Sequence, residues 1–400
     1  MLHRRDPLLA RRCYYGVVRF ESFLNQTLTE LATASLLREP DDGEERRVLA
    51  AAAAEAGVSV IDASSNDYLG LASRSVSRET HGNLGAGASR LIHGTTAEHL
   101  QLEAGLAAWV GAESALLFSS TYAANAGLIA ALGVRESVIV SDSANHASII
   151  DGARLAKAEI RVVEHLNLNA VRAALQGARG ARACWVVTES YFSMDGDGPD
   201  LAALRELCDA ADACLIVDEA HALGVFGPEG AGRCAEAGVR ADILVGALGK
   251  AIGSHGGFVA GSNALRTFLW NKARSFVFST APSPLQAELT REQVITVRAS
   301  DDLRRGLAEG SAELRARLVE AGLPLAPGSF GPVISIVLGD NERALAVAKH
   351  LRAAGVLAQA IRPPTVPAGA ARLRLTVKAT FSPTDIERLA LLVAEACRVL

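Results

Sequence analysis

The segment between residues 114 and 248 carries short apolar runs, separated by segments whose apolar residues recur at helical spacing. The runs at 183–189, 214–218 and 242–248 are nearly continuous in apolar residues, which is typical of strands buried on both faces of a sheet. Strands that alternate with helices favour a mainly parallel sheet joined by right-handed crossovers. The sequence therefore predicts a large α/β domain.

The pattern changes after about residue 284. Amphipathic helices at 285–318 lead to strands at 332–338, 356–362 and 371–377, and a last helix spans 383–400. This segment predicts a second α/β lobe of about 110 residues, an ordinary domain size. We expect three parts: an N-terminal arm and helix at 1–64, a large domain at 65–290 and a small C-terminal domain at 291–400.

Composition excludes several classes of protein. The formal net charge is −4, with 40 basic and 44 acidic residues and no basic stripe, so nucleic-acid binding is not expected. No apolar run approaches the roughly 20 residues of a membrane helix. The six cysteines form no CxxC pair and no Cys/His cluster with zinc spacing, which predicts buried thiols and no metal site. Residues 1–20 are arginine-rich and predict a basic arm, and we expect a cytoplasmic protein.

A single lysine, Lys250, lies in the small-residue stretch GALGKAIGSHGG. It follows the predicted strand 242–248, so it would lie at the carboxyl end of a strand, where open α/β sheets bind ligands. Removal from water lowers a lysine pKa below its usual value of about 10.4, and the neutral amine can attack a carbonyl group. A loop lysine that reaches solvent between turn glycines is the alternative. A P-loop and a dinucleotide fingerprint both fail, because Leu244 and Arg90 stand where glycines are required.

Other polar residues occupy similar positions. Asp218 ends a predicted strand, His221 follows three residues later, and His146 lies at a predicted helix start. An aspartate there could keep a pyridinium nitrogen protonated, and a histidine could stack on a flat ring or reach its oxygen. Helix capping or a structural role is the alternative for each. The segment 119–125 would offer amides of a helix N-terminus to a phosphate, and Ser193 lies in a polar turn. The combination favours a site for pyridoxal 5′-phosphate (PLP).

Six segments carry a resemblance to a known family. They are NDYLGL at 66–71, SSTYAAN at 119–125, DSANHAS at 142–148, TESYFSMDGD at 188–197, VDEAHALGVFG at 217–227 and LGKAIGSHGG at 248–257. In this order they resemble the α-oxoamine synthases, PLP enzymes of fold type I. The run AIRPPTVPAGAARLRLT at 360–376 resembles the family member that acts in biotin synthesis. The likeness extends from about residue 37 to the C-terminus.

The resemblance implies a fold and a reaction. The fold is the PLP-dependent transferase fold type I, with a large, mainly parallel-sheet domain and a smaller C-terminal α/β domain. The reaction is an acyl transfer in which L-alanine condenses with a pimeloyl thioester, carried on coenzyme A or acyl carrier protein, with loss of CO2 and of the free thiol. The family also implies a homodimer, while the charge and the apolar runs described above predict no nucleic-acid or membrane partner.

The resemblance also assigns roles residue by residue. Lys250, His146, Asp218 and His221 form the implied catalytic set, with Lys250 as the covalent cofactor anchor, Asp218 on the ring nitrogen and His146 stacked on the ring. Thr121 and Tyr122 would hold the phosphate, Ser193 and His221 would lie near the ring oxygen, and Ser279 and Thr280 could reach the cofactor across a dimer interface. Arg374, with Asn66 nearby, would bind the amino-acid carboxylate, and Arg362, Thr365 and Arg38 would contact the substrates.

One residue departs from the family pattern. The family usually has threonine three residues before the lysine, where its hydroxyl donates to the phosphate, and this chain has Ala247. A lost charge-assisted hydrogen bond costs about 1.5–3 kcal/mol, which would weaken cofactor binding without abolishing it. Ser254, His255 or the pair Ser279 and Thr280 could supply a replacement.

Three alternatives stay open. Another α-oxoamine synthase would use glycine, serine or a different acyl thioester. An aminotransferase or lyase would share the lysine and the aspartate but not the NDYLGL and HGTTAEH segments. A catalytically inactive PLP-binding or carrier-binding protein is the third alternative, and only Ala247 supports it.

Overall fold

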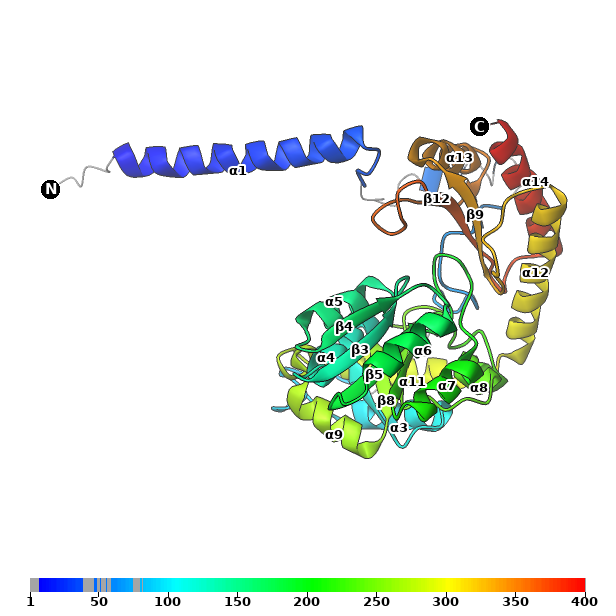
Figure 1. The fold of residues 1–400 in the computed structure, drawn as a ribbon. Helices are drawn as coiled ribbons and strands as arrows, with labels where there is room; N and C mark the ends of the chain where they lie inside the picture. Colours follow the sequence, from blue (N-terminus) through cyan, green and yellow to red (C-terminus); the bar gives the residue numbers. More distant parts are fainter. Residues whose placement is uncertain are drawn as a thin grey trace.

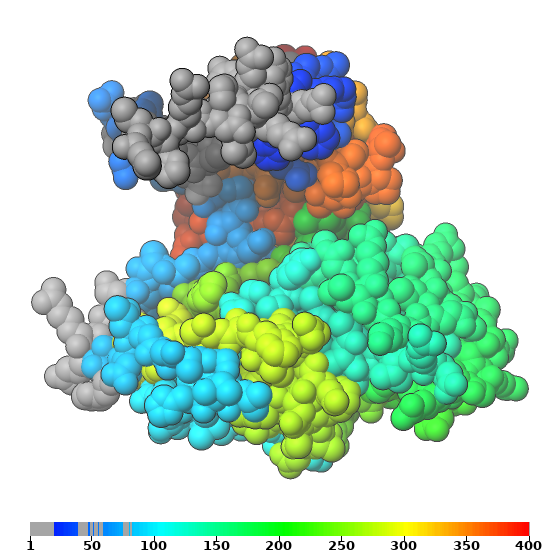
Figure 2. Space-filling model, turned by 90° about the vertical axis from the view of Figure 1, so that its left-hand side faces the viewer, coloured from blue at the N-terminus to red at the C-terminus, as the bar shows by residue number. Residues whose placement is uncertain are grey.

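The computed structural model describes residues 7–38, 47–48, 51, 55, 59–74, 80 and 82–399. Two lobes are visible in Figure 1, with the long helix α12 (Asp301–Glu320) reaching from one to the other. The space-filling view shows a narrow waist between the lobes (Figure 2). Helix α1 (Pro7–Thr33) extends away from the smaller lobe (Figure 1).

A sheet of seven strands forms the centre of the larger lobe, in the order β2-β8-β7-β6-β5-β3-β4. The strands are β2 (Ser114–Phe118), β3 (Ser137–Asp142), β4 (Glu159–Val163), β5 (Ala183–Glu189), β6 (Cys214–Asp218), β7 (Ile243–Ala247) and β8 (Gly257–Gly261). Only β8 runs antiparallel to its neighbours. The predicted mainly parallel sheet is therefore confirmed.

Helices cover both faces of this sheet. They are α3 (Ala97–Trp109), α4 (Thr121–Leu132), α5 (Ala147–Leu155), α6 (Leu168–Gly177), α7 (Leu201–Ala210), α8 (Arg233–Glu236), α9 (Asn263–Lys272), α10 (Arg274–Val277) and α11 (Pro284–Arg298), with the short 3-10 helix η1 (Pro228–Gly230). Val187 and Ile216 pack in one apolar cluster with α4 and α5, whereas Val186 and Leu215 pack in another with α6 and α7. Successive residues of one strand thus enter different cores, which explains the continuous apolar runs.

The smaller lobe combines a second sheet with the C-terminal helices. Its antiparallel sheet has the order β11-β12-β9. The elements are β9 (Val333–Gly339), α13 (Asn341–Ala353), β10 (Val356–Leu357), β11 (Gln359–Ile361), β12 (Ala371–Thr376) and α14 (Pro383–Val399). A further short strand, β1 (Ile61–Asp62), pairs with β10, so the chain before the large sheet contributes to this lobe.

Two elements differ from the sequence-based expectation. Strand β8 was not predicted, because the glycines at both of its ends weaken a strand pattern. Helix α1 begins at Pro7 rather than near residue 22, and it ends at Thr33, with Phe20 and Phe23 exposed. Among the described residues, no helix is long and apolar enough to cross a membrane.

Candidate active site

The predicted catalytic residues gather at the carboxyl ends of the central strands. Glu189 and Asp218 are the last residues of β5 and β6, and they lie opposite each other in the strand register. Lys250 lies three residues beyond the end of β7, and His146 caps α5 after β3. Parallel strands end at the same edge of a sheet, so these side chains converge there.

Asp218 is almost completely buried, at 4 % exposure, and protein donors hold both of its carboxylate oxygens. Asn125 on α4 donates from Nδ2 to Oδ2 at 2.7 Å, and the backbone amide of Ala220 donates to Oδ1 at 2.8 Å. Asn125 also donates to the Ser148 hydroxyl at 3.0 Å. The carboxylate is therefore oriented in advance, and its charge acts in a site of low polarity.

The environment of Lys250 favours the neutral amine. Burial lowers the pKa of Lys250 to about 8, and the guanidinium of Arg374 adds to the lowering, whereas Asp218 and Glu189 oppose it. Burial also raises the pKa of Glu189, and the Asp218 carboxylate raises it further. An amine of this kind can act as a nucleophile and as a general base near neutral pH.

The two histidines are held as neutral rings. His146 accepts at Nδ1 from the Ser148 amide at 3.2 Å, which leaves Nε2–H as a donor, and its ring is exposed in the single chain. Partial removal from water lowers the pKa of His146. Burial lowers the pKa of His221 well below its usual value, and its Nδ1 lies 2.7 Å from the Tyr68 hydroxyl. Burial raises the pKa of Tyr68 to about 12, so Tyr68 donates this hydrogen bond.

Arg374 reaches the site from β12 of the smaller lobe. Its Nε donates to the Ser193 carbonyl at 2.6 Å, and its Nη2 donates to Oδ1 of Asn66 at 2.9 Å. Arg374 is only 3 % exposed, and none of the described carboxylates forms an ion pair with it. A buried guanidinium held by neutral oxygens is suited to receive a carboxylate from a ligand.

The N-terminus of α4 offers a place for an anion. Thr121 and Tyr122 are its first two residues, and no described residue accepts a hydrogen bond from their backbone amides. The Thr121 hydroxyl lies 3.5 Å from the Gly246 carbonyl, and the Tyr122 hydroxyl donates to Asp151 at 2.5 Å. A Cβ on Gly257 would lie 2.5 Å from the Thr121 nitrogen, so β8 packs tightly behind this turn. The free amides and the helix dipole fit a phosphate group.

The methyl group of Ala247 is buried, and Ser254 does not supply the missing hydroxyl. The Ser254 hydroxyl accepts from Gln286 at 2.8 Å and lies 2.6 Å from the Thr290 hydroxyl. Thr290 donates its only proton to the Gln286 carbonyl, so Ser254 donates to Thr290. Its single proton is thus committed to α11.

The contacts of Ser279 and Thr280 are local or involve Ser89. The Ser279 hydroxyl has a weak contact of 3.4 Å with the Thr280 carbonyl, and Thr280 is exposed beside a bridge to Ser89. Within the described residues, no hydrogen bond joins either side chain to Lys250 or Asp218.

Arg38, Arg362 and Thr365 form a second cluster. Arg38 donates to the Thr365 hydroxyl at 3.4 Å, and Arg362 donates to the Ser35 carbonyl. Burial lowers the pKa of Arg362, and the Arg38 guanidinium lowers it further. The structure therefore brings Arg38 next to the segment that holds Arg362 and Thr365, far away in the sequence, with two positive charges near each other.

Three residues of the site were missed from the sequence: Glu189, Asn125 and Tyr68. Glu189 ends a buried strand in the same way as Asp218, so the same argument would have found it. Asn125 and Tyr68 lie within the quoted SSTYAAN and NDYLGL segments, but their contacts with Asp218 and His221 depend on the tertiary structure.

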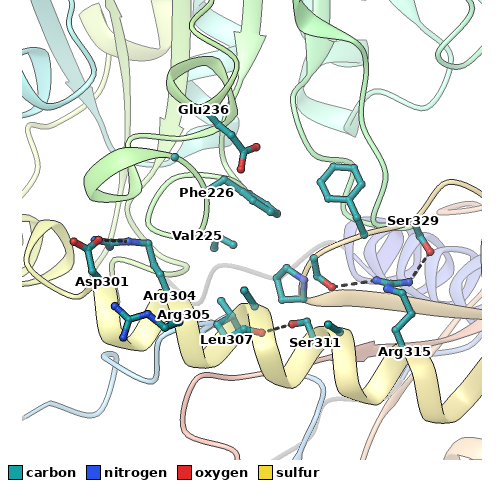
Figure 3. A pocket seen from close by; sticks show the side chains of 16 residues that line it. Val225, Phe226, Glu236, Asp301, Arg304, Arg305, Leu307, Ser311, Arg315 and Ser329 are labelled. Carbon is teal, nitrogen blue, oxygen red and sulfur yellow. Dashed lines mark hydrogen bonds and ion pairs between the residues drawn. The ribbon is translucent and has the colours of Figure 1, made fainter.

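A cavity of about 590 Å³ lies away from this cluster, between the segment 225–236, α12 and the turn before β9 (Figure 3). Phe226 and Leu307 line it, and Arg315 donates to the Ser329 hydroxyl at its edge. None of the catalytic cluster lines this cavity. Within the described residues, no group of three His, Cys, Asp or Glu side chains could hold a metal ion.

The pKa of Lys250 predicts its reactivity. At a limiting concentration of acetic anhydride, labelling of the cofactor-free protein at Lys250 should rise with pH and level off above about pH 9, because half of an amine with a pKa of about 8 is neutral at about pH 8 and nearly all of it is neutral one unit higher. A lysine peptide with a pKa of about 10.4 is the reference. Peptide mass spectrometry measures both rates. Labelling at Lys250 that follows the reference up to pH 10 would contradict the lowered pKa.

Comparison with known proteins places the chain among PLP enzymes. The family model "Aminotransferase class I and II" matches residues 58–391. The chain is 41% identical over 353 residues to the 8-amino-7-oxononanoate synthase of Marinobacter nauticus, covering 86% of this chain and 89% of that protein. It is 44% identical over 334 residues to the enzyme of the same name from Aromatoleum aromaticum, covering 82% and 86%.

Solved structures agree with these relatives. Sphingomonas wittichii serine palmitoyltransferase superposes with a TM-score of 0.80 at 29% identity, covering 85% of this chain and 88% of that chain. The crystal structure of 8-amino-7-oxononanoate synthase from Francisella tularensis superposes with a TM-score of 0.73 at 26% identity, covering 85% and 98%.

Proposed function

This chain belongs to the aminotransferase class I and II family, and we propose that it condenses L-alanine with a pimeloyl thioester to give 8-amino-7-oxononanoate, CO2 and a free thiol, a step of biotin synthesis. The observation that carries the proposal is the similarity to relatives of that name over more than four fifths of both chains. The converging Lys250, Asp218 and Arg374 side chains support it.

The residues at the strand ends fit PLP. Lys250 would hold the cofactor covalently, Asp218 would face the ring nitrogen, and the free amides of Thr121 and Tyr122 would receive the phosphate. His146 has an exposed ring for stacking, and Ser193 and His221 would lie on the side of the ring oxygen. When bound, PLP supplies an electron sink for the negative charge that develops on the amino-acid Cα.

Arg374 would orient the amino acid. Its guanidinium is already held by the Ser193 carbonyl and the Asn66 side chain, so it can pair with the substrate carboxylate without a large loss of side-chain entropy. The choice of the Cα bond that breaks first depends on this orientation, because the clamp sets which bond stands perpendicular to the ring.

Lys250 and His146 would move the protons. With a pKa of about 8, Lys250 is partly neutral at neutral pH and can remove the Cα proton. His146 accepts at Nδ1 from Ser148, so its Nε2–H is available to donate to an oxygen that becomes negative during loss of CO2. His221, kept neutral by burial, would donate a hydrogen bond rather than a charge.

The substrate side has a second positive cluster. Arg38, Arg362 and Thr365 would contact the acyl thioester, and two adjacent guanidinium groups suit a carboxylate or a phosphate. Coenzyme A and acyl carrier protein are both candidate carriers. We also propose a homodimer, in which Ser279 and Thr280 would reach the partner subunit's cofactor.

Product analysis tests this function. The purified protein with PLP should release CO2 and free thiol from L-alanine and pimeloyl-CoA or pimeloyl-acyl carrier protein, with a product of the mass of 8-amino-7-oxononanoate. Faster reaction with glycine or serine, or with another acyl thioester, would favour another α-oxoamine synthase. Binding of PLP without CO2 release from any pair would favour an inactive binding protein.

Arg374→Ala should raise the KM for L-alanine by about 10- to 100-fold, because a charge-assisted pair contributes about 1.5–3 kcal/mol. The KM for the thioester should change much less. Steady-state kinetics with each substrate varied in turn measures both constants, and Arg374→Lys, which retains the charge, should recover part of the loss. Equal effects on both substrates would remove the role assigned to Arg374.

A further inference from the structure

The loop 192–197 follows β5 in the larger lobe and contacts the sheet of the smaller lobe. Three of its consecutive residues contact three residues of that sheet. The Ser193 carbonyl accepts from Arg374, the Met194 carbonyl accepts from the Ser335 hydroxyl, and the Asp195 carboxylate pairs with Arg372.

These contacts all involve one face of the sheet. Arg372 and Arg374 are two residues apart on β12, so their side chains point to the same face, and Ser335 lies opposite Arg374 on β9. Leu373 and Ile336, which alternate with them, pack in the apolar core on the other face. Two guanidinium groups therefore lie side by side above the loop.

The two arginines differ in their partners. Arg372 is 6 % exposed and its charge is balanced by Asp195, while Arg374 is 3 % exposed and is held by neutral oxygens alone among the described residues. A substrate carboxylate entering this face would find two buried cations if Asp195 were absent. With Asp195 present, only one of them lacks a negative partner.

We propose that Asp195 is a positioning residue that occupies Arg372, so that the amino-acid carboxylate binds Arg374 alone and in a single orientation. This inference rests on the role of Arg374 in the proposed function. Since the orientation of the bound amino acid sets which Cα bond reacts, Asp195 influences both the affinity for the amino acid and the fraction of it that is bound in the reactive orientation.

The loop is anchored firmly enough on the larger lobe for this role. His165 bridges Asp142 at the end of β3, at 2.8 Å, and Asp197 of the loop, at 3.1 Å. The Phe192 amide donates to the Asp197 carbonyl at 2.8 Å, which closes the turn. A Cβ on Gly196, which has φ +70°, would lie 2.3 Å from the Val333 carbonyl oxygen, so the loop packs directly on β9. Asp195 is thus held in place from both lobes.

Charge variants test the inference. Asp195→Asn leaves Arg372 without a negative partner, so L-alanine can also bind unproductively at Arg372, and kcat and the KM for L-alanine should fall together by about tenfold. Arg372→Gln leaves a carboxylate near the substrate carboxylate, and it should raise the KM by a smaller factor, since Asp195 is 27 % exposed and solvent screens its charge. The double variant Asp195→Asn/Arg372→Gln removes both charges and should return to within about threefold of the unmodified protein.

Three further readouts separate positioning from simple loss of structure. The KM for the thioester, the affinity for PLP measured by fluorescence titration of the cofactor-free protein, and its melting temperature should each change little in Asp195→Asn. Asp302→Asn, which breaks an exposed ion pair with Arg305 on α12, is the matched charge control and should leave all constants unchanged.

The outcomes are distinct. Recovery in the double variant supports the proposal. If the kinetic constants for L-alanine in the double variant are as impaired as in the single variants, or more so, the proposal is overturned. The Asp195–Arg372 ion pair then only stabilises the contact between the two lobes. Parallel losses in PLP affinity and thioester KM also overturn it. Binding of L-alanine, glycine and serine is read directly from the absorption of the bound cofactor. The interaction between the Asp195 and Arg372 substitutions can therefore be measured even if the unmodified protein fails to release CO2 and the proposed function is wrong.

Discussion

Replacing Lys250 with alanine should reduce kcat by a factor of at least about 10³, because one side chain supplies both the covalent link and the general base, and removal of a base alone costs about 10²–10⁴. The fold should survive, since the turn at Lys250 is closed by its own backbone, with the Gly253 amide donating to the Lys250 carbonyl at 2.8 Å. Release of CO2 and free thiol measures the loss.

A chemical assay complements the kinetics. After borohydride reduction, the peptide that contains Lys250 should carry the added mass of the cofactor in the unmodified protein and not in Lys250→Ala. Lys272→Ala, which changes an exposed lysine on α9, should retain both the activity and the adduct. Turnover of Lys250→Ala above about one per cent of normal would remove the central role assigned to this lysine.

The second large effect concerns Asp218. We expect Asp218→Asn to lower kcat by about 10- to 100-fold or more, because it removes a charge-assisted contact worth about 1.5–3 kcal/mol to the protonated ring nitrogen. Asp218 also opposes the lowering of the Lys250 pKa, so its loss should shift the labelling profile of Lys250 to lower pH. Steady-state kinetics and the acetic anhydride assay measure these two effects.

The neighbourhood of Asp218 calls for a stability control. Asn125 donates its amide to Asp218, so an asparagine at 218 can place two amide groups against each other in a buried site. Thermal unfolding of Asp218→Asn and of Asp209→Asn, an exposed aspartate that pairs with Arg205 on α7, separates lost stability from lost catalysis. A kcat within twofold of normal for well-folded Asp218→Asn would contradict the assignment.

Much of the fold follows from local pattern. Strands β5, β6 and β7 appear where the apolar runs at 183–189, 214–218 and 242–248 predict them, because most of their residues are buried on both faces of the sheet. Strand β8 escaped prediction, since glycines lie at both of its ends and its pairing with β2 joins segments far apart in the chain. The nine residues at 248–256 that join β7 to β8 give no strand signal of their own.

The catalytic edge of the sheet was also predictable. Lys250, Asp218 and His146 each follow a buried strand, and parallel strands bring their carboxyl ends together, so the sequence order of the motifs is enough to place them near each other. Glu189 obeys the same rule, and its proximity to Lys250 is visible in the opposing effects on their pKa values.

The sequence by itself determined the fold class, the lysine and its carboxylate partner, because local patterns of burial set strand ends and strand ends converge. Only the tertiary structure decided how the smaller lobe meets that edge: that Arg374 contacts the Ser193 carbonyl and Asn66, and that Asp195 occupies Arg372. Such contacts join segments about 180 to 310 positions apart in the chain, and they depend on the packing of two separate sheets, for which no periodicity within either segment carries a signal.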